Sequence, residues 1–143
     1  MPSRIHRAPW QPGPAAPDAT TPCLVSVTEF TAAGHLRTAG VALNGMRLRR
    51  TWPRTGGAVG MWLWVDPPRR RSGSVSVWTG DHALVAFLRR ADHARTVRAF
   101  RGHGTMRATA WTVPVFDAAA VWDAARTLLT SAAPWPTREG DRR

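Results

Sequence analysis

Four stretches of the chain alternate apolar and polar residues, or are apolar throughout, and each predicts a β-strand. In the first stretch Val25 and Val27 alternate with Ser26 and Thr28, which is typical of a strand with one buried face. The stretch that begins at Ala58, AVGMWLWV, is apolar on both faces and indicates a central strand. The predicted strands are 24–31, 58–65, 74–79 and 106–113.

Three other stretches carry apolar residues at three- and four-residue spacing and predict helices. They cover 35–50, 81–100 with a break near Ala91, and 117–131. The segments between the elements are rich in Gly, Pro and Arg. The segment 51–57, TWPRTGG, interrupts the chain before the second strand, and 66–72, DPPRRRS, predicts a hairpin connection between the second and third strands.

The order strand, helix, strand, strand, helix, strand, helix predicts an α+β fold of the ferredoxin-like, split βαβ kind. We expect a four-stranded antiparallel sheet with helices on one face, plus a C-terminal helix. Because the strand 58–65 is apolar on both sides, the second face of the sheet also needs a cover. The simplest cover is the same face of a second subunit, so the sequence predicts a homodimer.

Composition divides the chain into one domain and two tails. Residues 1–22 contain six prolines and only one aromatic side chain, Trp10, so we expect a flexible leader. Residues 134–143 predict a flexible tail, although Trp135 could dock on the domain. The expected domain is 23–133, and a chain of 143 residues with 43% hydrophobic residues can build one core without disulfides or metals.

The formal charge of +11 makes nucleic acid a candidate partner. All 20 basic residues are arginines, however, and tyrosine is absent, which is how a GC-rich genome encodes proteins. The arginines also stand in separate groups, so nucleic acid is not an expected partner. The longest apolar stretch is far below the roughly 20 residues that cross a bilayer. With no secretion signal and one cysteine, Cys23, we expect a cytoplasmic protein.

The segment 76–93, SVWTGDHALVAFLRRADH, resembles a motif of known proteins. In this motif a strand ends in tryptophan and is followed by a short acidic turn. A helix then begins with Ala-Leu, and an aromatic residue and a histidine occupy later positions. These places are held by Trp78, Asp81, Ala83, Leu84, Phe87 and His93. The pattern resembles the dimeric α+β barrel proteins of the antibiotic-biosynthesis-monooxygenase type and their spheroidene-monooxygenase-like relatives. With the order of elements, the resemblance covers about 24–113.

The resemblance implies a dimeric α+β barrel, but it leaves the activity open, because one fold carries many functions. Similar barrels include cofactor-independent oxygenases, haem-degrading enzymes, isomerases, cyclases and proteins of no known activity. Many monooxygenase-like members carry a histidine where this sequence has Phe87.

His93 is the main catalytic candidate, because a neutral imidazole facing the space between helices and sheet could act as a base or a haem ligand. A capping or packing role beside Asp92 is the alternative. Phe87 belongs to the expected substrate pocket, and His103, on a glycine-flanked turn, either gates that pocket or lies in a surface loop. Glu29 and Arg107 are charged residues in predicted strands, for which solvent exposure is favoured over an orienting pair in the pocket.

Four tryptophans on predicted strands suggest a pocket for a flat polycyclic or polyene ligand. They are Trp62, Trp64, Trp78 and Trp111. Ordinary core packing is the alternative reading of the same residues.

Other chemistries find no support in the sequence. The histidine spacings and the lone cysteine do not predict a metal site. Motifs for dinucleotide binding, phosphate loops and nucleophile elbows are absent. Cys23 has no neighbouring base in the sequence and is not predicted to be a nucleophile.

The leading hypothesis is a small monooxygenase-like enzyme of secondary metabolism that holds an aromatic or polyene substrate and needs no bound organic cofactor. Molecular oxygen would react with the ionised substrate, and His93 would take or relay the proton. A haem enzyme with His93 as iron ligand, a cyclase or isomerase, and a non-catalytic basic binding protein remain the alternatives.

Overall fold

The computed structural model describes residues 4–16, 21–34, 45–47, 49–89 and 104–136. Four long strands form the sheet: β3 (Cys23–Ala32), β4 (Ala58–Asp66), β5 (Arg71–Trp78) and β6 (Gly104–Val113). Two short strands, β1 (His6–Arg7) and β2 (Gln11–Pro12), pair with β4. The helices are α2 (Asp81–Leu88) and α4 (Ala118–Thr130), with two 3₁₀ turns, η1 (Trp52–Arg54) and η2 (Pro67–Arg69).

The long strands lie in the order β4-β5-β3-β6, and every neighbouring pair is antiparallel. Numbered in chain order, the first and third long strands lie in the centre, and the second and fourth lie at opposite edges of this group. Each of the two crossovers therefore joins parallel strands that have another strand between them, which is the split βαβ arrangement that the sequence predicts. The α+β fold with a four-stranded antiparallel core is confirmed.

The four predicted strands are all confirmed, and each is slightly longer than expected. The largest difference is at β5, which begins at Arg71, where Asp66 of β4 is its register partner. The connection is consequently only four residues long, and Arg70 takes the left-handed conformation that closes it (φ 55°). An arginine-rich sequence is typical of a loop. Arg71 nevertheless lies in the sheet, because the carboxylates of Asp66 and Glu29 balance its charge inside the fold.

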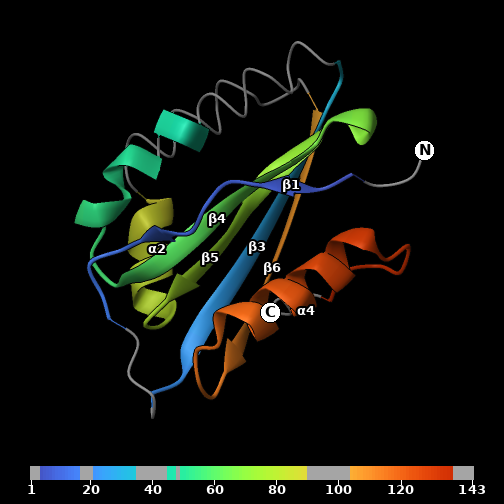
Figure 1. The fold of residues 1–143 in the computed structure, drawn as a ribbon. Coiled ribbons are helices and arrows are strands. Elements are labelled where there is room, and N and C mark those ends of the chain that lie inside the picture. Colours follow the sequence, from blue (N-terminus) through green and yellow to red (C-terminus); the bar gives the residue numbers. More distant parts are fainter. Residues whose placement is uncertain (1–3, 17–20, 35–44, 48, 90–103, 137–143) are drawn as a thin grey trace.

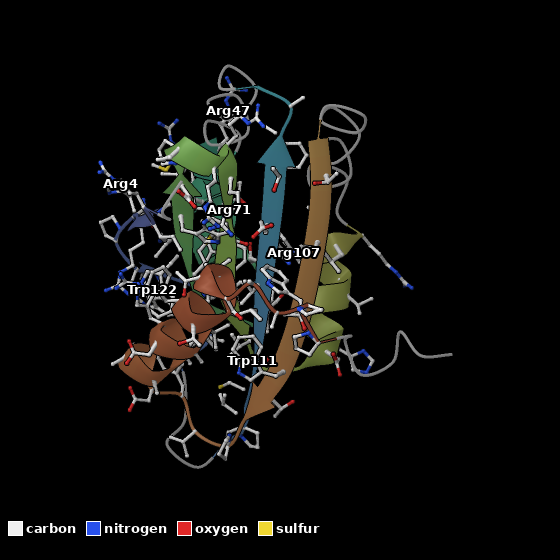
Figure 2. All side chains as sticks on the ribbon, turned by 90° about the vertical axis from the view of Figure 1, so that its right-hand side faces the viewer. Arg4, Arg47, Arg71, Arg107, Trp111 and Trp122 are labelled. Carbon is white, nitrogen blue, oxygen red and sulfur yellow. The ribbon has the colours of Figure 1, made fainter. Side chains whose placement is uncertain are left out.

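The two helices lie on opposite faces of the sheet, which we call the α2 face and the α4 face (Figures 1 and 2). On the α2 face, Leu84 and Phe87 of α2 pack on Met61 and Trp78. The α4 face has the larger apolar cluster, in which buried α4 side chains meet the valines of β3 and β5. Its members from α4 are Val121, Ala125 and Leu129, and those from the sheet are Cys23, Val25, Val27, Val59, Trp62, Trp64, Val75 and Val77.

The α4 helix covers valines on the face for which the sequence predicted a second subunit, and the homodimer itself stays a prediction. The helix begins at Asp117, whose carboxylate accepts a hydrogen bond from the Ala120 amide (3.2 Å). Its apolar stripe then covers the valines, so one chain supplies a cover for its own sheet.

The expected flexible leader is corrected for residues 4–16. This segment runs along β4, with hydrogen bonds from the amides of Ala8 and Gly13 to the carbonyls of Leu63 and Val59 (2.8 and 2.9 Å). Its proline-rich composition does not prevent this, because the segment lies at the edge of the sheet, where an amide is not needed on the outer side. We call residues 4–16 the N-terminal strap.

At the other end of the chain, residues 134–136 lie on the α4 face. The Thr109 hydroxyl donates to the Pro136 carbonyl (2.8 Å), and the Arg107 guanidinium lies 4.0 Å from the Trp135 ring centroid. The docking of Trp135 is thus confirmed, and this part of the expected tail packs on the domain.

The predicted helix 35–50 is described only in part, as helical residues 45–47 and 49–51. The predicted helix 81–100 is confirmed for α2 and otherwise lies outside the described residues, as does the break near Ala91. None of the described helices has the length and apolar character needed to cross a membrane.

Candidate functional site

The α2 face carries small hydroxyl side chains at the centre of β3 and β5. Ser26 is the register partner of Ser76, and Thr28 is the partner of Ser74. The Thr28 and Ser74 hydroxyls lie 3.0 Å apart and share a hydrogen bond, and the Ser76 hydroxyl donates to the Ser26 carbonyl (3.5 Å). Strands with side chains this small present a low, polar surface on that side of the sheet.

An aromatic cluster stands beside these hydroxyls on the same face. Trp52 of η1, Trp78 of β5 and Phe87 of α2 have ring centroids 5.0 to 5.3 Å apart, in tilted and edge-on arrangements. All three side chains are buried, and the Trp78 indole donates to the Ser76 hydroxyl (2.9 Å). Because each ring packs against the other two, the cluster is a rigid apolar wall next to the polar centre of the face.

The sequence did not indicate Trp52 as a member of this cluster, because Trp52 stands in the segment 51–57, which predicts an interruption before the second strand. Its indole N–H is buried and has no hydrogen-bond partner in the described part of the chain. A large aromatic residue in an otherwise polar turn was the available signal, because such a side chain must find an apolar partner.

A pocket of about 420 Å³ opens between η1 and α2, next to the aromatic cluster. One side is apolar and comes from α2, and the other is polar and comes from the turn around η1. Its lining consists of Ala83, Ala86 and Phe87 on the first side and Thr51, Arg54, Thr55 and Gly56 on the second. The volume falls within the roughly 300–1,000 Å³ of small-molecule sites.

The walls of this pocket are held together by a close backbone approach. Gly57 has a φ of +77° and packs so tightly on Ala83 that any β-carbon there would collide with the Ala83 side chain. The Gly57 carbonyl also accepts a hydrogen bond from the Thr79 amide (2.9 Å). Glycine is therefore required at this position, and it fixes the distance between η1 and α2.

The four strand tryptophans do not line one pocket, because they lie on both faces of the sheet. Trp78 belongs to the α2 face, whereas Trp62 and Trp64 are buried in the α4 cluster and Trp111 packs against its edge. The physical reason is the two-residue period of a strand, which sends alternate side chains to opposite faces. The expectation of a single tryptophan-lined pocket is corrected, and among these residues only Trp78 adjoins the site built by Phe87.

On the α4 face the tryptophans pack among themselves and around an arginine. Trp62 lies 4.4 Å from Trp10 of the N-terminal strap and 5.7 Å from Trp122 of α4, measured between ring centroids. The guanidinium of Arg7 lies over Trp62 and Trp122, at 5.4 and 4.7 Å. These contacts join the strap, the sheet and α4, and they account for the tryptophans as core.

A network of four charged residues crosses the α4 face at one end, and we call it the charge network. Arg71 donates to Asp66 through Nη2 (2.7 Å), to Glu29 through Nη1 (2.9 Å) and to the Leu129 carbonyl of α4 (2.9 Å). Arg107 donates to both Glu29 oxygens (2.9 and 3.1 Å). Figure 2 shows Arg71 and Arg107 close to the end of α4.

The charge network corrects the expectation of solvent exposure for Glu29, whereas Arg107 is exposed as expected, with 41% of its side chain accessible. Glu29 is 5% exposed and Asp66 is fully buried, and two arginines balance these two carboxylates. The Asp66 carboxylate also accepts a hydrogen bond from the Arg4 amide (3.0 Å). Through the contacts of Arg71 with Leu129 and of Asp66 with Arg4, the network anchors α4 and the strap.

His93 and His103 both lie outside the described residues. The described histidines, His6 and His82, are exposed. No group of three potential metal ligands occurs within the described ranges. Cys23 is buried on the α4 face, and this burial raises the pKa of its thiol, so it lacks the ready thiolate of a nucleophile.

No protein-family model matches the sequence, and the search of curated protein sequences finds no significant match. Solved structures do match. A variant of SnoaB, a cofactor-independent oxygenase from Streptomyces nogalater, is 20% identical with a TM-score of 0.55, and the match covers 66% of this chain and 95% of SnoaB.

Two proteins from Listeria monocytogenes are similar at lower identity. A ferredoxin-fold protein related to antibiotic biosynthesis monooxygenases is 12% identical with a TM-score of 0.52, over 64% of this chain and 57% of that one. The heme-degrading enzyme LmHde is 10% identical with a TM-score of 0.54, over 74% of this chain and 69% of that one. These similarities establish the fold, which is the ferredoxin-like fold of antibiotic-biosynthesis-monooxygenase-like proteins.

Proposed function

We propose that this protein is a small monooxygenase-like enzyme that binds a hydrophobic aromatic or polyene substrate on the α2 face and oxidises it with molecular oxygen without a bound organic cofactor. The observation that carries the proposal is the pocket beside Trp52, Trp78 and Phe87, in a fold shared with a cofactor-independent oxygenase over two-thirds of the chain. The rigid aromatic wall suits a planar substrate, and the polar side of the pocket lining, with Thr51 and Arg54, can orient its polar groups.

The chemistry needs a substrate that ionises to an enolate or phenolate and can give an electron to oxygen. For a substrate with a CH₂ group that is conjugated with a carbonyl, directly or through an aromatic ring, the reaction converts CH₂ and O₂ into C=O and water. One oxygen atom of O₂ forms the new carbonyl, and the other leaves as water with the two hydrogens of the CH₂ group. The substrate supplies all four electrons. The protein contributes orientation, exclusion of water and removal of the first proton, and we propose His93 for that proton transfer.

Haem is the alternative cofactor, since one similar structure is a heme-degrading enzyme. The described residues do not fit haem well on the α2 face. Tyrosine is absent from the chain, the cysteine lies on the α4 face, and both described histidines are exposed. The axial ligand that the sequence suggested, His93, lies outside the described residues, so we derive no step through haem.

Oxygen uptake with 1,8-dihydroxyanthrone, a planar ionisable probe with a CH₂ group, tests the proposal. We expect the protein to raise uptake above the non-enzymatic rate, with one O₂ consumed per substrate. His93→Ala is expected to lower the rate constant about 100-fold, within the usual range for losing a general base. His6→Ala is the matched control because His6 is exposed at β1, and its rate should equal that of the wild type.

Three results would contradict the proposal. The first is uptake no faster than in buffer. In the second, substrate is converted without oxygen, which favours the cyclase or isomerase alternative. The third is a Soret band on titration with haemin that His93→Ala abolishes, which makes the protein a haem enzyme.

A further inference from the structure

Among the described residues, Arg54 is the one charged side chain that lines the pocket between η1 and α2. It is exposed, and the ion pairs among the described residues leave it without a carboxylate partner. Asp81, the acidic residue in the first turn of α2, does not line the pocket. The guanidinium is therefore a positive charge at the pocket that no carboxylate of the described lining residues neutralises.

The remaining lining separates into an apolar and a polar side. Ala83, Ala86 and Phe87 form a smooth wall without hydrogen-bonding side chains, and Phe87 is held in place by Trp52 and Trp78. Opposite this wall, Arg54 stands with two threonines, and the Thr55 hydroxyl donates to the Thr51 carbonyl (3.1 Å). This arrangement suits a ligand with one flat apolar face and one charged edge.

We propose that the pocket recognises a planar hydrophobic anion, with Arg54 binding the ionised carboxylate, enolate or phenolate while the ring system lies against Phe87. The inference rests on the proposed function, for which it defines the charge state of the bound substrate. A guanidinium beside an acidic hydroxyl favours the ionised form, and its planar fork pairs with two oxygens at once. Arg54 would thus hold the substrate in the form that reacts with oxygen.

The test compares two nearly isosteric probes by calorimetric titration, 2-naphthoate and its neutral amide, 2-naphthamide. We expect naphthoate to bind the wild type about fivefold to tenfold more tightly than naphthamide, which is the fold-change expected for a charge-assisted hydrogen bond. Arg54→Gln is expected to remove that preference and leave naphthamide binding unchanged. Arg54→Lys should retain part of the preference, because it keeps the charge and loses the fork.

Two matched controls separate the pocket from general effects of charge and bulk. Arg126→Gln makes the same charge change at an exposed position of α4, on the opposite face, and should leave the preference intact. Ala86→Trp fills the pocket from an exposed position of α2 and should abolish binding of both probes. Ala124→Trp places the same bulk at an exposed position of α4 and should bind both normally.

Equal binding of the two probes to the wild type overturns the inference, as does an equal loss in Arg54→Gln and Arg126→Gln, which would report attraction by net charge alone. Binding of either probe to Ala86→Trp with wild-type affinity places the ligand elsewhere and also overturns it. The test does not depend on oxygen chemistry. Selective naphthoate binding without oxygen uptake supports the anion-binding role of Arg54 and contradicts the proposed oxygenase activity. Oxygen uptake without a preference for naphthoate supports the oxygenase activity and contradicts the role of Arg54.

Discussion

At the scale of single residues, the most consequential side chain outside the candidate site is Arg71. It stands in a run of three arginines that reads as a solvated loop, yet it is 6% exposed and forms ion pairs with two buried carboxylates. Charged groups are buried only where partners compensate the lost hydration. Asp66 and Glu29 are such partners, but they come from different strands, so the sequence around Arg71 does not reveal them.

Replacing Arg71 by Met should lower the free energy of unfolding by about 3–5 kcal/mol, because it leaves two buried carboxylates without their main partner. Arg107→Met should cost only about 1 kcal/mol, since the Arg107 side chain is 41% exposed and the surrounding water compensates Glu29. Urea unfolding followed by tryptophan fluorescence measures both values. Equal losses in the two variants would mean that Arg71 does not anchor the network as described.

At the scale of elements, the strands were the predictable part, because alternation of apolar and polar residues is a local property. The N-terminal strap was not predictable in this way. Its prolines disfavour a regular element, and its partner, the outer edge of β4, lies about fifty residues further along the chain. The Trp10 indole lies against Gly60 of β4 and occupies the space that a β-carbon at position 60 would need. The strap is thus ordered by contacts that only the folded chain provides.

Trp10→Ala should therefore destabilise the protein by about 2 kcal/mol, since it removes a large half-buried ring from Trp62 and Phe116. The strap should also become sensitive to proteases, which limited proteolysis with mass spectrometry can follow. Trp135→Ala is the comparison, because Trp135 docks at the opposite end of the α4 face and should leave the strap protected. Cleavage within residues 4–16 of the wild type, at the rate seen in Trp10→Ala, would count against an ordered strap.

At the scale of the whole molecule, the sheet separates two environments. The α2 face combines small hydroxyls, an aromatic wall and an open pocket, whereas the α4 face is closed by α4, the strap and residues 134–136. The candidate chemistry belongs to the first face and much of the packing energy to the second. A substitution under α4 should accordingly affect stability and self-association before it affects ligand binding.

Ala125→Asp tests this division, because Ala125 is fully buried between α4 and the sheet. An unpartnered carboxylate there should cost several kcal/mol, release α4 and expose the valines beneath it. We expect a lower Tm and self-association in size-exclusion chromatography with light scattering. Ala124→Asp carries the same change on the exposed side of α4 and should behave as the wild type. An unchanged Tm in Ala125→Asp would show that α4 is not a necessary cover.

The sequence by itself determined the strands, the confirmed helices and the split βαβ order, because these follow from periodicities within ten to twenty residues. The two-residue period of a strand also requires Trp62 and Trp64 to share one side of β4 and Met61 and Leu63 the other, and the two clusters agree with it. Which face a cluster belongs to, and what covers that face, depended on strand order and on the path of α4. Only the tertiary structure therefore separated Trp78 from the other strand tryptophans, brought Trp52 and Phe87 beside it, and joined Glu29 to Arg71 and Arg107.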